Sequence, residues 1–255
     1  MRIATWNVNS LNVRLPHVLD WLATHQPDVL CLQETKLEDA QFPLDALWQA
    51  GYQAAFSGQK TYNGVAILSK VAATEVTYGL PGFPGEQKRL IAATINNIRT
   101  VCVYVPNGQS VGSGKYLYKL SWLAALHEWL KEELDHHPKL ALLGDFNIAP
   151  EDRDVYDPKA WAGNVLVSEQ ERAAFRTLEQ LGFCDSFRLF EQPEKSYSWW
   201  DYRMMAFRRN MGLRIDHILL SNALVPACTG STIDRAPRKL ERPSDHAPVV
   251  AELTS

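Results

Sequence analysis

The segment Lys139-Leu140-Ala141-Leu142-Leu143-Gly144-Asp145-Phe146-Asn147 joins a continuously apolar run to a glycine and then to acidic and amide side chains. A second run of this kind, Val29-Leu30-Cys31-Leu32, leads into Gln33 and Glu34. Continuous apolar runs of this length are typical of strands that are covered on both faces. We therefore expect a sheet inside the protein, with polar side chains at the ends of its strands.

Short β-rich runs recur along the chain and alternate with helical patterns. The predicted strands cover Arg2–Val8, Asp28–Leu32, Gly64–Leu68, Leu90–Ile95, Thr100–Val105, Lys139–Leu143, Arg214–Leu220 and Ala247–Ala251. The predicted helices cover Leu15–Thr24, with Pro16 in the first turn, Lys115–His136 and Ser168–Leu181. No linker or repeat divides the chain, so we expect one domain over residues 1–255, an α/β or α+β sandwich.

The composition is that of an ordinary globular protein, since 46% of the 255 residues are hydrophobic and 22% are charged. The net charge of −3 argues against a non-specific polyanion binder but leaves room for a local phosphate-binding patch. The four cysteines form no C-x-x-C pair, and no apolar run approaches the roughly 18–20 residues of a membrane span. We expect reduced thiols, no membrane element and a cytoplasmic location.

Polar side chains stand at or near the ends of several apolar strands. They are Asn7, Glu34, Asp145 with Asn147, Asp216, and Asp245 with His246. Each strand should deliver its polar end to the rim of the sheets, where loops assemble functional sites on a rigid frame.

Each of these residues taken alone also has an ordinary structural explanation. Glu34 can be a solvated loop end, Asp145 a turn former after glycine, and His246 a histidine that is simply satisfied by hydrogen bonds. Asp216 is harder to explain in this way, because a carboxylate inside an apolar strand is costly without a partner.

Together, these residue types suit metal-assisted cleavage of a phosphodiester. Carboxylate and amide oxygens favour a hard cation such as Mg²⁺, and the absence of Cys/His ligand spacing disfavours zinc. The metal would neutralise phosphate charge while a carboxylate orients or deprotonates the attacking water. A histidine fixed by a second carboxylate can hold the oxygens of the developing phosphorane.

Six motifs carry a resemblance to a known family. They are Trp6-Asn7-Val8-Asn9-Ser10, Leu32-Gln33-Glu34-Thr35-Lys36, Val103-Tyr104-Val105-Pro106-Asn107-Gly108, Gly144-Asp145-Phe146-Asn147-Ile148-Ala149, Leu213-Arg214-Ile215-Asp216 and Ser244-Asp245-His246-Ala247-Pro248. In this order they resemble the exonuclease III family of AP endonucleases, within the endonuclease–exonuclease–phosphatase superfamily. The resemblance spans Ile3 to Glu252 and implies a four-layer α/β sandwich, in which helices flank two packed mixed β-sheets.

The resemblance also implies a role for each matching residue. The metal site would be formed by Asn7, Glu34, Asp145, Asn147, Asp245 and His246, with Glu34 as the principal ligand of Mg²⁺, which Mn²⁺ can replace. The catalytic residues would be Tyr104, Asp145, Asn147, Asp216 and His246. Among these, Asp145 would activate water or protonate the leaving group, Asn147 would position the nucleophile, and Asp216 and His246 would form a carboxylate–imidazole pair facing the phosphate. Tyr104 and Asn107 would contact the phosphate.

One position departs from part of the family. Some members carry an aspartate where this chain has Asn9, and that aspartate supplies a further carboxylate to the metal site. Because Asn9 is neutral, a two-metal scheme that depends on this residue is in doubt, and one or two metal ions remain open.

The resemblance implies that the partner is duplex DNA containing abasic sites, which a monomer would bind. The pocket for the flipped abasic sugar would be made by Trp199, Leu213 and Ile215, and Arg203 would act as a wedge in the duplex. Nearby, Arg208, Arg209 and Arg214 would form a cationic strip for phosphates. Without the other motifs, the tryptophan would be assigned to the core and the arginines to a solvated face.

The expected activity is hydrolysis of the phosphodiester 5′ to an abasic site, which leaves a 3′-hydroxyl, with 3′–5′ exonuclease and 3′-phosphatase activity beside it. The alternatives are a DNA 3′–5′ exonuclease with little abasic-site activity and a phosphoinositide phosphatase of the same superfamily. A further alternative is a DNA-binding protein that has lost catalysis. Several buried charges retained without a metal would be expensive, which argues against this last alternative.

Overall fold

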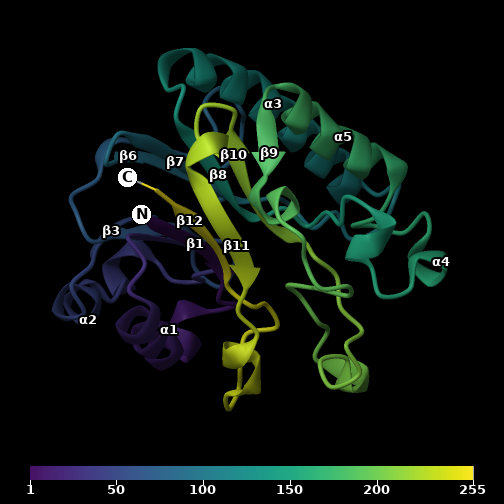
Figure 1. Ribbon diagram of the computed structural model, residues 1–255, viewed down its shortest axis with the longest axis horizontal. Helices are drawn as coiled ribbons and strands as arrows, with labels where there is room; N and C mark the ends of the chain where they lie inside the picture. The colour runs from purple at the N-terminus through teal and green to yellow at the C-terminus, as the bar shows by residue number, and fades with distance from the viewer. Residues whose placement is uncertain (255) are drawn as a thin grey trace.

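The computed structural model describes residues 1–254, and two mixed β-sheets pack face to face in it with helices on both outer surfaces (Figure 1). The first sheet has six strands in the order β11-β12-β1-β2-β4-β3. They are β1 (Arg2–Asn7), β2 (Val29–Gln33), β3 (Gln53–Ser57), β4 (Val65–Ser69), β11 (Cys228–Ile233) and β12 (Val249–Leu253). At its centre, β1 runs parallel to β2 and antiparallel to β12.

The second sheet also has six strands, in the order β5-β6-β7-β8-β10-β9. They are β5 (Thr74–Tyr78), β6 (Leu90–Ile95), β7 (Ile98–Tyr104), β8 (Leu140–Asp145), β9 (Phe183–Asp185) and β10 (Asp216–Ser221). Here β7 runs parallel to β8, while β10 is antiparallel to β8 and pairs Asp216 with Asp145. Each sheet therefore contains one central parallel pair whose carboxyl ends are polar.

The inner faces of the two sheets share one apolar core. Ile3 and Ile67 of the first sheet belong to the same buried cluster as Ile91, Leu143 and Ile218 of the second. On the outer faces, α1 (Leu11–His25) and α2 (Leu44–Gln49) cover the first sheet, while α3 (Gly114–His136) and α5 (Glu169–Gln180) cover the second (Figure 1). This arrangement confirms the predicted sandwich of two mixed sheets flanked by helices.

The structure contains elements that the apolar pattern did not predict. They are β3, β5, β9 and β11, the helices α2 and α4 (Pro158–Trp161), and short 3-10 turns at Asp39–Gln41, Asp152–Asp154, Ser186–Leu189, Arg203–Met205, Val225–Ala227 and Ala236–Lys239. All four strands lie at the edges of their sheets, and β5 and β11 also have a shifted register, so their sequences lack a buried apolar run. Helix α1 begins at Leu11, before the predicted start at Leu15. Pro16 therefore lies beyond the first turn of the helix, and not within it as predicted.

The predicted capping box of α5 is confirmed. Ser168 caps α5 in a reciprocal capping box, since its hydroxyl accepts from the Glu171 amide and its own amide donates to the Glu171 carboxylate. Gly144 is required within β8, because a Cβ at this position would lie 1.9 Å from the carbonyl oxygen of Val103 on β7. No helix in residues 1–254 is long and apolar enough to cross a membrane.

Arg214 is a structural residue rather than part of a cationic surface. Its side chain is buried, and it donates 2.7 Å hydrogen bonds to Asp154 and Asp185. A buried arginine held by two carboxylates is not available to phosphates, so the predicted strip keeps only the exposed Arg208 and Arg209.

His217 lies beside this ion network and is buried in the neutral form. Its Nδ1 is 3.0 Å from Arg214 Nη1, and its Nε2 is 2.9 Å from the carbonyl oxygen of Ile148. Arg214 therefore donates to Nδ1, while Nε2–H donates to Ile148. Burial, reinforced by the positive charge of Arg214, lowers the pKa of His217 to about 4.

We predict that His217 makes the protein less stable as the pH falls from about 6.5 towards 4. Over this window the unfolded chain binds a proton at His217 that the folded chain does not, so the free energy of unfolding declines by at most about 1.4 kcal/mol per pH unit from this group. Urea unfolding at several pH values should show a shallower decline for His217→Gln. Equal slopes for both proteins would contradict the prediction.

Candidate active site

The carboxyl ends of the two parallel strand pairs meet at one rim of the sandwich. Asn7 ends β1, Glu34 follows β2, and Asp145 ends β8. The Asn7 amide nitrogen donates 2.9 Å hydrogen bonds to Glu34 Oε1 and to Asp145 Oδ2, which joins the two sheets at this point. The structure thus brings together side chains that are far apart in sequence, as predicted.

Glu34 is held beside a lysine that the sequence argument left without a role. Lys36 Nζ lies 2.9 Å from Glu34 Oε2 and donates a 2.5 Å hydrogen bond to Asn9 Oδ1. Burial raises the pKa of Glu34, but Lys36 and the hydrogen bond from Asn7 outweigh it, and the pKa is lowered overall. Glu34 is therefore a carboxylate at neutral pH.

His246 and Asp216 form the predicted carboxylate–imidazole pair. His246 Nδ1 lies 2.8 Å from Asp216 Oδ2, and its Nε2 lies 3.8 Å from Asp145 Oδ2. Burial opposes a charge on the ring, but the carboxylates of Asp216 and Asp145 outweigh it and raise the pKa of His246 to about 10. The Nε2–H of a doubly protonated ring faces the same space as Asp145.

Asp216 itself is fixed by Ser198, which the sequence argument missed. The buried Ser198 hydroxyl donates a 2.7 Å hydrogen bond to Asp216 Oδ2 and accepts from the amides of Ile215 and Asp216. A single serine in a loop carries no spacing signal, so only the folded chain assigns it this role.

Asp145 is the most perturbed carboxyl group of the site. It accepts a 2.9 Å hydrogen bond from the Asn147 amide, and it is buried close to Asp216 and His246. Burial raises its pKa to about 7, because the lowering effect of His246 only partly offsets the loss of solvent and the nearby Asp216 charge. A carboxyl group in this range can take or give a proton near neutral pH.

Asn107, Asn147 and Tyr104 line the second-sheet side of the rim. Asn147 has a left-handed backbone with φ of +50°, and its side-chain oxygen accepts a 3.2 Å hydrogen bond from Asn107. Burial and the carboxylate of Glu34 raise the pKa of Tyr104, so its hydroxyl remains protonated. Arg89, another residue without a sequence signal, lies 4.7 Å from the Tyr104 ring centroid and donates to its carbonyl.

Within residues 1–254, one group of acidic and histidine side chains has the spacing of a metal site. Ligand atoms of Glu34, Asp145 and His246 lie within 4.8 Å of one another. The two carboxylates of this group suit a hard divalent cation, which would neutralise phosphate charge and polarise a P–O bond when bound. The residues present therefore fit the metal that the sequence predicts.

Two predicted ligands have their side-chain oxygens occupied by hydrogen bonds. Asn7 presents its amide nitrogen to the carboxylates, and its oxygen accepts from the Asn9 amide. Both oxygens of Asp245 accept hydrogen bonds, one from Asn9 and one from the indole of Trp199. Direct ligation by Asn7 and Asp245 stays a prediction, and their observed contacts orient the residues around Glu34.

The residues predicted to form the sugar pocket belong to one packed apolar cluster. Leu213 and Ile215 are 0% and 1% exposed, and they share a cluster with Leu166 and the partly buried Trp199. Leu166 has a left-handed backbone with φ of +76°, held by a hydrogen bond from its amide to Glu171 and one from Ala149 to its carbonyl.

The loop after Trp199 extends into solvent. Arg203, predicted as a wedge, is 84% exposed and pairs with Asp201 at 2.6 Å. The next residues, Met204 and Met205, are 71% and 64% exposed, and both have a left-handed backbone. These apolar side chains are displayed to solvent beside Arg203, so the tip of the loop carries both charge and apolar surface.

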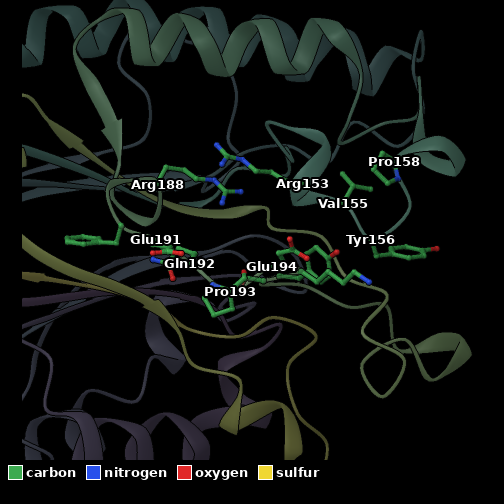
Figure 2. A pocket seen from close by; sticks show the side chains of 13 residues that line it. Arg153, Val155, Tyr156, Pro158, Arg188, Glu191, Gln192, Pro193 and Glu194 are labelled. Carbon is green, nitrogen blue, oxygen red and sulfur yellow. The ribbon is translucent and has the colours of Figure 1, made fainter.

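Two cavities lie outside the rim itself. A groove of about 600 Å³ adjoins the site through Asn107 and Arg89 and is lined by amides, cations and tyrosines, with no carboxylate. A separate cavity of about 580 Å³ lies between the segments 153–158 and 188–197 (Figure 2). Its arginines, Arg153 and Arg188, are already paired with Glu151 and Asp154, so their charges are largely neutralised.

A sandwich of two mixed sheets with a buried acidic rim, a carboxylate–imidazole pair and a metal-type cluster defines a metal-dependent phosphoesterase. The chain matches the family model described as Endonuclease/Exonuclease/phosphatase family over residues 4–246, and it belongs to this family.

The relatives narrow the class to DNA-repair nucleases of the exonuclease III and AP endonuclease type. Exodeoxyribonuclease III of Haemophilus influenzae is 36% identical, with 99% of this chain and 100% of the relative covered. Two solved structures match this chain over its full length, and each match also covers 100% of the solved chain. A 3′ phosphatase from Neisseria bound to a product DNA hairpin has a TM-score of 0.98 and 50% identity, and an AP endonuclease from Archaeoglobus fulgidus has 0.96 and 40%.

We predict that Asp145→Asn and His246→Ala each reduce DNA cleavage by orders of magnitude and leave DNA affinity nearly unchanged, because both residues are expected to act on the reacting phosphate rather than to bind the duplex. Single-turnover cleavage and binding in a chelator measure the two effects separately. Asp135→Asn and His136→Ala, exposed on α3, serve as controls. Near-normal turnover in either site variant would remove that residue from its role.

Proposed function

We propose that the chain hydrolyses the P–O3′ ester bond of DNA and leaves a 3′-hydroxyl. Release of a 3′-phosphate, removal of a 3′-terminal nucleotide and incision 5′ to an abasic site all break this bond. The three reactions differ only in what lies on the far side of the phosphorus. The shape of the protein on the far side of the phosphorus therefore decides which of the three reactions is preferred. The same rim residues serve all three reactions.

The rim residues supply the hydrolysis itself. Asp145, with a pKa near 7, deprotonates or orients the attacking water or protonates the departing O3′. Asn147 positions the nucleophile, and Tyr104 and Asn107 contact the phosphate. The His246 imidazolium, held by Asp216, donates to a non-bridging oxygen as negative charge develops on it.

We propose Mg²⁺ as the metal, with Glu34 as its principal ligand and Mn²⁺ as a substitute. Glu34 supports this proposal because its lowered pKa keeps it charged, and because an oxygen-rich cluster favours hard cations. Neutral Asn9, bonded to Lys36 and Asp245, offers no second carboxylate at this side of the site. One ion is therefore the simpler stoichiometry.

We predict that a chelator abolishes hydrolysis and that added Mg²⁺ or Mn²⁺ restores it. Glu34→Gln should weaken Mn²⁺ binding, measured by electron paramagnetic resonance, because it removes the principal negative charge. Glu38→Gln, on the exposed turn that follows, is the matched control. Hydrolysis that continues unchanged in the chelator would contradict the metal assignment.

We propose that the partner is DNA and that the molecule acts as a monomer. The carboxylate-free groove contains Arg89 and Lys115 with Tyr62 and Tyr118, a combination that suits a phosphate backbone and stacked bases. On the other side of the rim, Arg203 and the exposed arginines after it would contact the backbone. These local patches compensate for the net charge of −3.

We infer that 3′-phosphate release predominates over abasic-site incision. The observation that carries this inference is the closed apolar cluster: Leu166 packs with Leu213 and Ile215, where a flipped sugar would have to enter. A 3′-phosphate places nothing beyond the phosphorus and needs no such space. The 50% identical 3′ phosphatase from Neisseria agrees with this preference.

Abasic-site incision is the second candidate. Its support is the partly buried Trp199, which lies between the closed cluster and His246, and the 40% identical AP endonuclease from Archaeoglobus fulgidus. A modest shift of Leu166 would expose the apolar surface that an abasic sugar contacts.

The deciding experiment assays one purified sample on three DNA duplexes that carry a 3′-phosphate end, a recessed 3′ end and an internal abasic site. We expect the highest kcat/KM for the 3′-phosphate and a lower value for the abasic site. The reverse order would overturn the preference and favour the second candidate. Phosphate release from an inositol polyphosphate, with all three duplexes left intact, would decide for a phosphoinositide phosphatase.

We predict that Leu166→Gly raises abasic-site incision relative to 3′-phosphate release by about tenfold or more, because it opens the cluster and suits the left-handed backbone. Leu166→Ala removes the bulk of the side chain but keeps the Cβ and its strain, so it separates volume from backbone conformation. An unchanged ratio of the two activities in both variants would show that Leu166 does not limit access.

A further inference from the structure

A buried ion pair lies directly behind the rim. Lys119 of α3 and Glu171 of α5 are both 0% exposed, and Nζ of the lysine is 2.5 Å from Oε1 of the glutamate. A pair withdrawn this far from water needs its remaining donors and acceptors satisfied, since its attraction otherwise fails to offset the loss of hydration. Lys119 finds such hydrogen-bond partners in the loops of the site.

The ammonium group of Lys119 bonds to the two asparagines assigned to the phosphate and the nucleophile. It donates 3.1 Å and 2.6 Å hydrogen bonds to the carbonyl oxygens of Asn107 and Asn147. These residues belong to different loops, one after β7 and one after β8. A single charged donor therefore sets the distance between the two loop backbones, while the asparagine side chains bond to each other at 3.2 Å.

Glu171 extends the same connection to another part of the site. The Oε1 atom that pairs with Lys119 also accepts a 3.0 Å hydrogen bond from the Leu166 amide, and Oε2 accepts from the Ser168 amide and hydroxyl. The ion pair thus fixes the two asparagine loops and the segment whose leucine closes the apolar cluster.

We propose that Lys119, neutralised by Glu171, is a positioning residue that holds Asn107 and Asn147 in their working geometry. It touches no reacting atom and acts through the two backbone carbonyls. The left-handed backbone of Asn147 needs such external support, because an L-residue adopts this conformation at a cost. This inference rests on the proposed roles of Asn107 and Asn147 and is independent of which P–O3′ substrate is preferred.

The test is the double variant Lys119→Met/Glu171→Gln, which removes both charges together and leaves no unpaired buried ion. The matched control is Arg99→Met/Glu133→Gln. Arg99 is also buried, at the opposite end of β7, and it pairs at 2.6 Å with Glu133, which is 16% exposed. Like Lys119, Arg99 also donates to a backbone carbonyl. Both variants lose a buried cation with a carbonyl partner, so they should have similar melting temperatures.

We expect kcat to fall by about tenfold or more in the Lys119 variant, with KM little changed, and to stay at the wild-type value in the control. Backbone amides in residues 105–109 and 145–149 should exchange hydrogen faster in the Lys119 variant only. Equal kcat values and equal exchange in the two variants would overturn the proposal.

A mutant cycle with Asn147→Ala separates positioning from general stability. If Lys119 acts through Asn147, its variant costs much less in the Asn147→Ala background than in the wild type. An equal loss in both backgrounds would also overturn the proposal. Failure of the proposed function would show differently, in a wild-type protein that hydrolyses none of the three DNA duplexes, and hydrogen exchange would still test the role of Lys119.

Discussion

The site depends on the alignment of two parallel strand pairs across the apolar layer between the sheets. Parallel neighbours deliver their carboxyl ends to the same edge, so β1 and β2 bring Asn7 and Glu34 together, while β7 and β8 bring Tyr104 and Asp145 together. Because the two sheets pack face to face, these edges meet, and the Asn7 amide bonds to a carboxylate from each sheet. A shift of one sheet against the other would separate every pair of groups on which the chemistry relies.

This alignment brings several charged side chains together in a buried place. The groups around them determine whether each side chain keeps its charge. Asp145 and Asp216 are paired residues on neighbouring strands, and two carboxylates so close in a buried place would repel each other. The His246 imidazolium contacts both carboxyl groups and offsets this repulsion, so its own pKa is raised. Burial raises the pKa of Asp145 to about 7, and His246 opposes this rise. The same balance of charges provides a proton donor, His246, and a group that exchanges protons near neutral pH, Asp145. The interactions that stabilise the buried charges therefore also make the site reactive.

Loops outside the strands surround the rim. Leu166 belongs to a closed apolar cluster, and the buried Lys119–Glu171 pair links that cluster to the asparagine loops. If Leu166 limits the space beyond the phosphorus, as proposed above, substrate access and the geometry of the reacting groups are coupled through one ion pair. The exposed loop at Met204 and Met205 is not constrained in this way and is available to contact DNA.

The sequence by itself determined the central strands, the long helices and the residues of the rim. Buried strands require continuous apolar runs, and the six motifs identify the polar residues that follow them. The sequence did not predict edge strands such as β5 and β9, because they are short or exposed and carry no continuous apolar run. Only the tertiary structure revealed that Arg214 is a buried anchor, that Ser198 bonds to Asp216 and Lys119 to Asn147, and that Leu166 packs with Leu213 and Ile215. These roles arise from contacts between distant segments, which the local order of residues does not encode.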